Sequence, residues 1–113
     1  MQTIDLSSLE KEVSYNSDGL VPVIAQDAKS KAVLMMAWMN KEALGITLRT
    51  RDVTYYSRSR QKLWRKGETS GHTQTLVDAQ IDCDGDTLLL LVEQIGGACH
   101  TGAPNCFFRQ IKL

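Results

Sequence analysis

The short segment from Asp82 to Asp86 has the order Asp-Cys-Asp-Gly-Asp and combines three carboxylates with a thiol. The carboxylates alternate along the chain, so an extended backbone would direct all three to one side and Cys83 to the other. Clustered carboxylates repel one another unless a cation neutralises them, and their oxygens suit magnesium or calcium, whereas a thiolate prefers zinc. The segment therefore predicts ligands for two different metals. A plain acidic turn between strands is the alternative, because Asp-Gly pairs are common there.

An EF-hand calcium loop is excluded for this segment. Its acidic positions are present, at Asp82, Asp84, Asp86 and Glu93. The position that requires glycine is occupied by Thr87 instead, and the apolar run that follows it is typical of a buried strand.

The three cysteines, Cys83, Cys99 and Cys106, are candidate zinc ligands. An odd number cannot pair completely within one chain, and a reducing cytosol disfavours disulfides. Three thiolates could hold a catalytic zinc and leave its fourth position open. Buried cysteines acting as small apolar residues are the alternative. Glycines around Cys99 and Cys106 indicate that these two lie on turns, where backbone can wrap around a bound group.

Two histidines, His72 and His100, are candidates for proton transfer. Three anionic thiolates would weaken the effect of zinc on the pKa of a water molecule, so a protein base would help. A histidine side chain titrates near neutrality and suits this task. His100 could instead be a further zinc ligand or form a hydrogen bond to a loop, and His72 could contact a substrate. The sequence leaves these roles open.

A basic stretch between Ser57 and Gly71 is suited to binding phosphate, because it combines cations, hydroxyls and flexible backbone. An indole within it offers a stacking face for a base. A solvated surface loop is the alternative. The candidate substrate contacts are Arg58, Arg60, Trp64, Lys66, Ser70 and Gly71.

The elements that must position these residues indicate an α+β fold with a mixed or antiparallel sheet and one or two short helices. Residues 20–26 and 32–39 are apolar, β-branched runs separated by a polar stretch, as in a strand hairpin. Asn40 can cap a helix that runs to about Arg49. Further strands are expected at residues 53–57, 75–81 and 87–94, with a last one possible at 107–113.

The length and the charge balance of the sequence restrict the classes of protein to which it could belong. The 113 residues suit a single domain spanning 1–113. Thirteen Lys and Arg balance thirteen Asp and Glu, so no global basic field favours nucleic acid. The longest apolar run is far too short to span a membrane, and the polar start lacks a signal core. We therefore expect a cytoplasmic protein without nucleic-acid or membrane partners.

The chain resembles the phosphoribosyl-AMP cyclohydrolase family over roughly nine-tenths of its length. The resemblance is carried in order by VLMMAWMNKEAL, YYSRSRQKLWRKGETSGHTQ, DCDGDTLLLLVEQ, GGACHTG and PNCFFR. Two small departures are Tyr56, where Trp is usual in the family, and Asn105, where Ser is common. Neither affects a proposed metal ligand.

The resemblance implies a stand-alone enzyme of histidine biosynthesis, without the pyrophosphohydrolase domain to which the family is sometimes fused. It would hydrolytically open the six-membered adenine ring of phosphoribosyl-AMP to the phosphoribosyl-formimino aminoimidazole carboxamide ribotide. It also implies an intertwined homodimer with one zinc per subunit, held by Cys83 of one subunit and Cys99 and Cys106 of the other. Magnesium would be bound by Asp82, Asp84 and Asp86.

Two other functions compete with this interpretation. A zinc-dependent nucleobase deaminase would also attack an aromatic ring with water, but its His-x-Glu and Pro-Cys-x-x-Cys signature is absent from the sequence. A zinc-stabilised nucleotide-binding or RNA-binding module could use Trp64 and the basic stretch. The balanced charge and the acidic cluster argue against that module.

Overall fold

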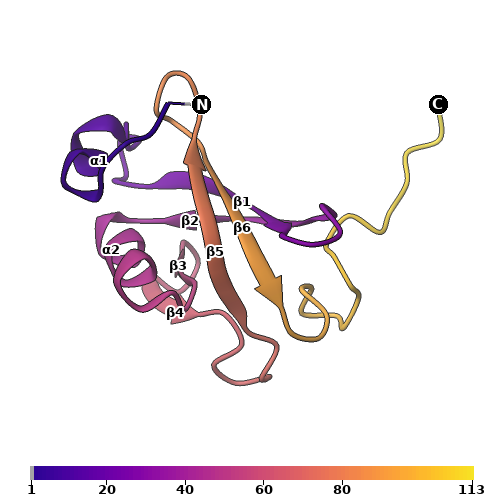
Figure 1. Cartoon of the computed structure of the whole chain (residues 1–113). Helices are drawn as coiled ribbons and strands as arrows, with labels where there is room; N and C mark the ends of the chain where they lie inside the picture. Colours follow the sequence, from indigo (N-terminus) through magenta and orange to yellow (C-terminus); the bar gives the residue numbers. More distant parts are fainter. Residues whose placement is uncertain (1) are drawn as a thin grey trace.

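The computed structural model describes residues 2–113, with two helices and six strands over that range (Figure 1). The helices are α1 (Leu6–Glu12) and α2 (Lys41–Thr50). The strands are β1 (Val21–Asp27), β2 (Val33–Met39), β3 (Thr54–Ser57), β4 (Lys62–Arg65), β5 (Gln74–Ile81) and β6 (Leu88–Gln94).

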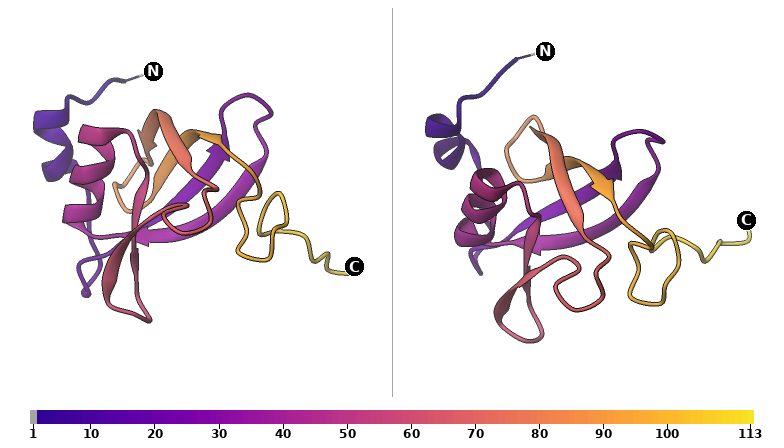
Figure 2. Two further views of the ribbon diagram at one scale, coloured as in Figure 1. Left: turned by 90° about the horizontal axis from the view of Figure 1, so that it is seen from below. Right: turned by 60° about the horizontal axis from the view of Figure 1, so that its bottom comes forward.

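Four of the strands form a mixed sheet in the order β2-β1-β6-β5. The β1–β2 and β5–β6 pairs are antiparallel hairpins, and β1 runs parallel to β6 between them. Strands β3 and β4 form a separate antiparallel pair. Figure 2 shows α1 and α2 lying side by side at one end of the sheet. The expected α+β class with a mixed sheet and two short helices is therefore confirmed.

One face of the sheet carries the core. Alternate residues of β1, Val21, Val23 and Ala25, are completely buried, as are Leu90 and Val92 of β6. This alternation follows from the two-residue period of a strand, which turns every second side chain inward. Burial of these side chains holds the β5–β6 hairpin against β1. It therefore also fixes the positions of the two ends of that hairpin, and the candidate site residues lie at these ends.

Helix α2 begins where the sequence predicts. The Asn40 side chain accepts a hydrogen bond from the Ala43 backbone N–H at 2.8 Å, which satisfies one of the unpaired donors of the first turn. Buried Thr47 then joins the helix to β3, because its hydroxyl accepts from the Thr54 N–H at 2.9 Å. The predicted hairpin and the strands at β3, β5 and β6 are also confirmed, within a residue or two at their ends.

Three local features differ from the sequence-based expectation, and the sequence left a fourth open. Helix α1 and strand β4 were not predicted. The Asp82–Asp86 segment is a tight turn, which the sequence allowed as the alternative to an extended backbone, because the Asp82 carbonyl accepts from the Gly85 N–H at 3.2 Å. Residues 107–113 form no strand, since they run away from the sheet with their apolar side chains exposed (Figure 1).

No helix in the part of the chain that the structure describes is long and apolar enough to cross a membrane.

Candidate active site

A pocket of about 550 Å³ lies between β2, the loop that follows β4, and the turns after β6. Its lining includes Met35 and Met36 of β2, all of residues 64–70, and most of residues 97–102 together with Cys106. The pocket therefore joins the predicted phosphate-binding stretch to two of the three cysteines.

Cys99 and Cys106 lie on turns, as the surrounding glycines predict. The Cys99 carbonyl accepts from the Gly102 N–H at 2.9 Å, and the Cys106 N–H donates to the Leu34 carbonyl of β2 at 2.8 Å. These bonds make the two thiols neighbours, so that each affects the pKa of the other. All three cysteines are free thiols.

The two thiols differ in acidity. A hydrogen bond from the Thr101 hydroxyl to the Cys99 sulfur, at 3.1 Å, lowers the pKa of Cys99. Partial desolvation and the neighbouring Cys99 sulfur raise the pKa of Cys106. One thiol of the pair is thus prepared to be a thiolate, which is the form that binds zinc.

Lys66 brings a buried cation to these thiols. Only 8% of its surface is exposed, and its Nζ lies 5.9 Å from the centre of the Trp64 ring. Burial lowers the pKa of Lys66, while the sulfurs of Cys106 and Cys99 raise it. An ammonium group in this position favours negatively charged partners, either thiolates or a substrate phosphate.

The other predicted substrate contacts divide into two groups. Arg60, Trp64 and Ser70 line the pocket together with Lys66. Arg58 lies instead over the Trp38 ring, 4.6 Å from its centre, and Gly71 follows the lining segment in the next turn.

Both histidines line the pocket, and they come from two different loops. His72 follows the basic loop, just before β5, and is half-buried. His100 lies on the cysteine turn and is exposed.

Two further residues near the pocket were missed by sequence reasoning. Glu68 lines it, and the Glu68 carboxylate accepts from the Arg65 N–H at 3.4 Å. Gln74 is a nearly completely buried amide, 1% exposed, and its Nε2 donates to Sδ of the pocket residue Met35 at 3.4 Å. The position of Gln74 two residues after His72 was the only available signal.

The acidic turn forms a separate cluster. Oxygens of Asp82, Asp84 and Asp86 lie within 4.8 Å of one another, and all three side chains are exposed. Desolvation acts to raise the pKa of Asp82, but hydrogen bonds from Asp86 and Thr87 outweigh it and lower that pKa. Hydrogen bonding to Asp84 and Asp82 raises the pKa of Asp86. Three carboxylates this close fit a hard divalent cation by the chemistry of their oxygens.

Cys83 and the acidic turn lie at the far end of the β5–β6 hairpin from Cys99. Strand β6 separates them, and its seven residues span roughly 20 Å at the rise of a strand. In Figure 1 the acidic turn is beside the amino terminus, whereas the cysteine turns lie near the other end of β6. One chain therefore does not bring all three cysteines to a single metal.

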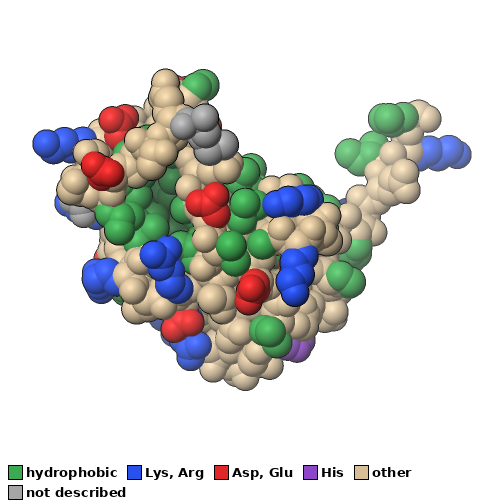
Figure 3. Space-filling model, viewed as in Figure 1, with side chains coloured by type: hydrophobic (Ala, Val, Ile, Leu, Met, Phe, Trp, Pro, Cys, Tyr) green, Lys and Arg blue, Asp and Glu red, His purple; other side chains and the backbone are tan. Residues whose placement is uncertain are grey.

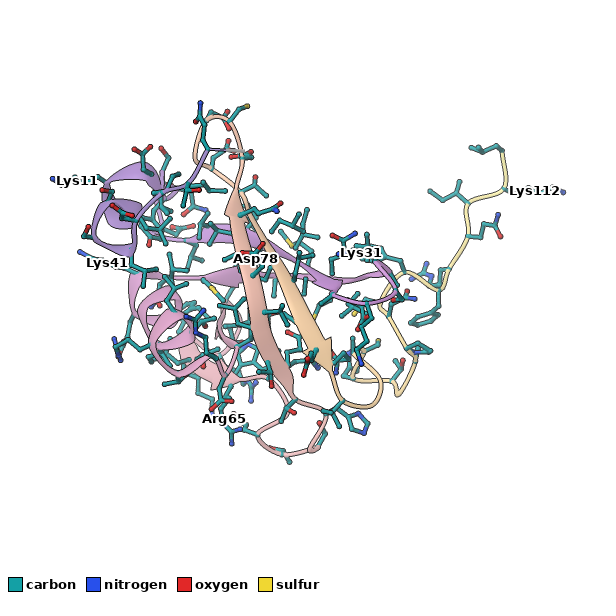
Figure 4. The ribbon with its side chains drawn as sticks, in the orientation of Figure 1. Lys11, Lys31, Lys41, Arg65, Asp78 and Lys112 are labelled. Atoms are coloured by element: carbon teal, nitrogen blue, oxygen red, sulfur yellow. The ribbon has the colours of Figure 1, made fainter. Side chains whose placement is uncertain are left out.

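Next to Cys83 is a second, larger hollow of about 820 Å³, which we call the apolar groove. Figure 3 shows hydrophobic side chains gathered there between α1, α2 and β5. Asp78, labelled in Figure 4 on β5, lines the groove, whereas Arg65, labelled at the lower end of the molecule, lines the pocket. Polar residues that include Gln80, Asp82 and Asp84 line part of the groove, and the leucines that line it are Leu6, Leu9, Leu44, Leu48, Leu88 and Leu90.

Comparison with known proteins identifies the family. Residues 35–108 match the family model described as phosphoribosyl-AMP cyclohydrolase. The chain belongs to the phosphoribosyl-AMP cyclohydrolase family. The matched region contains every candidate metal ligand and both histidines.

Curated relatives of the cyclohydrolase family agree over most of the chain. A phosphoribosyl-AMP cyclohydrolase of Acidiphilium cryptum is 64% identical over 97 residues, covering 86% of this chain and 84% of the relative. Phosphoribosyl-AMP cyclohydrolase 2 of Pseudomonas fluorescens is 56% identical, covering 95% of this chain and 73% of the relative. A phosphoribosyl-AMP cyclohydrolase of Alkalilimnicola ehrlichii is 58% identical with similar coverage.

Proposed function

We propose that this chain catalyses hydrolytic opening of the adenine six-membered ring of phosphoribosyl-AMP, a step of histidine biosynthesis. The observation that carries the proposal is the pocket itself. It gathers two thiols, two histidines and a group of cations in one place, within a chain whose relatives are named for this reaction. Among the alternatives, a deaminase lacks its signature residues here, and a nucleic-acid module lacks a basic surface field.

The thiol pair supports zinc as a cofactor. Cys99 and Cys106 are free, adjacent and close to a buried cation that favours their ionised form. Soft sulfur ligands select zinc over magnesium or calcium. Zinc, when bound, supplies a Lewis acid that lowers the pKa of water and polarises the ring. The carboxylates of the acidic turn support magnesium as the second metal, because hard oxygens are the ligands it prefers.

The chain's own residues can perform the remaining tasks. Arg60, Lys66 and Ser70 provide donors for the substrate phosphates at one wall of the pocket. The Trp64 ring offers a face against which the purine can stack. His72 or His100 can accept the proton that the attacking water loses, because both line the same pocket.

The position of Cys83 supports a homodimer in which each zinc is shared. Cys83 is exposed at the far end of the hairpin from the other two thiols, so a third sulfur ligand would have to come from a second copy. The apolar groove beside Cys83 offers a surface for that copy, because a hollow lined with leucines gains free energy when it is covered. A two-fold dimer would use the arrangement twice and form two equal sites.

The test follows absorbance while purified, zinc-loaded protein is incubated with phosphoribosyl-AMP. We expect ring opening by the wild type and by Asn105→Ser, a neighbouring change that leaves every ligand in place. Cys99→Ala should be inactive and lose zinc. An inert, folded wild type would contradict the proposal, and release of ammonia would identify a deaminase instead.

A further inference from the structure

A chain of hydrogen bonds runs from the buried Tyr55 hydroxyl toward the half-buried His72. The Tyr55 hydroxyl donates to Gln74 Oε1 at 2.6 Å, and Gln74 Nε2 donates to Gln94 Oε1 at 2.9 Å. Gln94 Nε2 then donates to the His72 carbonyl at 3.4 Å and to the Ile95 carbonyl at 2.9 Å. The chain joins β3, β5 and β6 and ends on the backbone of a pocket residue.

Two glycines fit closely around His72. A Cβ placed on Gly96 would lie 2.5 Å from Cδ2 of the His72 ring, and one on Gly67 would lie 2.5 Å from the His72 carbonyl carbon. Both glycines have positive φ, at +69° and +81°, which other residues rarely adopt. The imidazole therefore packs on the Gly96 backbone, while the carbonyl of the same residue is held between Gly67 and the Gln94 amide.

The other histidine lacks this support. His100 is exposed on the cysteine turn, whereas His72 is half-buried and held from two sides. The structure thus distinguishes two pocket histidines that the sequence leaves equivalent.

The polar chain has no obvious advantage for stability. Tyr55 is completely buried and Gln74 is 1% exposed, in a core made mostly of aliphatic and methionine side chains. A hydrogen bond between neutral groups adds only about 1 kcal/mol net, and a well-packed apolar pair can be as stable. Unlike an apolar pair, these hydrogen bonds fix the orientation of the side chains, because each amide group orients the next one.

We propose that Gln74 and Gln94 are positioning residues that hold His72 in its place in the pocket, with Tyr55 fixing the far end of the chain. Resting on the proposed function, this inference makes His72 the histidine whose placement the ring-opening step needs. Gln94 holds the backbone of His72 through the hydrogen bond to its carbonyl, and close packing against Gly96 holds the imidazole ring.

The test combines NMR of the histidine imidazoles with kinetics. The signal that disappears in His72→Gln belongs to His72, and the His100 signal serves as an internal reference. Gln94→Met removes both the acceptor for Gln74 and the amide donor to the His72 and Ile95 carbonyls, while Gln94→Glu keeps that acceptor and removes the amide donor. Gln26→Met is the matched control, because Gln26 also donates to a backbone carbonyl, that of Lys31, but lies in the β1–β2 hairpin.

We expect both Gln94 variants to shift or broaden the His72 signal and leave His100 unchanged, with Gln26→Met altering neither. In ring opening, Gln94→Met should lower kcat on the order of 10- to 100-fold with little change in KM, as displacement of an active-site group does. In the His72→Gln background the same change should cause no further loss, because Gln94 would act only through His72.

Two results would overturn the inference. One is an unchanged His72 signal in both folded Gln94 variants. The other is an equal loss of kcat from Gln94→Met with and without His72, which indicates a general structural role. If the wild type were inert but the His72 signal moved as expected, the placement of His72 would stand and the proposed ring-opening function would fail.

Discussion

Complementation between two variants that each lack one cysteine tests the proposed sharing of a zinc site between subunits most directly. Cys83→Ser and Cys99→Ser each remove one sulfur ligand, and each homodimer should be inactive. In a mixed dimer with two-fold symmetry, one site would lose both ligands, while the other would keep Cys83 from one subunit and Cys99 with Cys106 from its partner. Two inactive proteins should thus give an active one.

The activity and zinc content expected of the mixed dimer follow from the distances between the cysteines. Two sulfurs bound to one zinc lie within roughly 5 Å of each other, since each Zn–S bond is about 2.3 Å. Strand β6 alone places roughly 20 Å between the turns that carry Cys83 and Cys99 in the same chain. A site completed within one subunit is therefore excluded for this fold, and a purified mixed dimer should retain about half the activity and half the zinc of the wild type.

The assay uses co-expression with two different affinity tags, so that only mixed dimers survive both purification steps. The matched control pairs Cys99→Ser with Cys106→Ser. Because these residues belong to the same half-site, both sites of that dimer stay broken and no activity should return. An inactive mixed dimer of Cys83→Ser and Cys99→Ser, or an active Cys83→Ser homodimer, would refute the reasoning.

Three other predictions concern stability and the second metal. Tyr55→Phe leaves Gln74 Oε1 buried without its 2.6 Å donor, so we expect a loss of about 1–3 kcal/mol in urea unfolding at fixed protein concentration; an unchanged midpoint would contradict the burial argument. Asn40→Ala removes the α2 cap and should cost about 1 kcal/mol, whereas Asn40→Asp should retain most of it, as thermal denaturation can show. Asp84→Asn should weaken magnesium binding in titration calorimetry without reducing zinc content, and parallel loss of both metals would mean that the two sites are not independent.

Much of the fold could be predicted from local patterns. The β1–β2 hairpin follows from two apolar runs around a polar turn, and α2 from a capping asparagine before good helix formers. Helix α1 gave only a weak signal, because it has seven residues and few of them are apolar; in the structure Asp5 at its start makes no side-chain capping bond. Strand β4 was hidden by charge, since Lys62 and Arg65 at its ends made the segment resemble a solvated loop.

The candidate site was predictable in its residues more than in its geometry. Residue type alone indicated thiols for zinc and carboxylates for magnesium. The sequence left the conformation at Asp82 open, because the alternating carboxylates fit an extended backbone and the Asp-Gly pair fits a turn; in the structure the Gly85 N–H closes a tight turn onto the Asp82 carbonyl. Gln74 and Gln94 were missed because a glutamine in a strand carries no sign of burial. Their importance arises only when β5 and β6 are paired in register.

The parallel pairing of β1 with β6 has a consequence for how the protein is made. Val23 pairs with Leu88, so the first hairpin gains its inner neighbour only after most of the chain has been synthesised. Until then the β1 edge of that hairpin has no strand paired with it. Contacts between residues so far apart in sequence also form slowly. A nascent chain stalled before residue 88 would therefore expose an unpaired β1 edge, and we expect it to depend on chaperones more than the finished chain does.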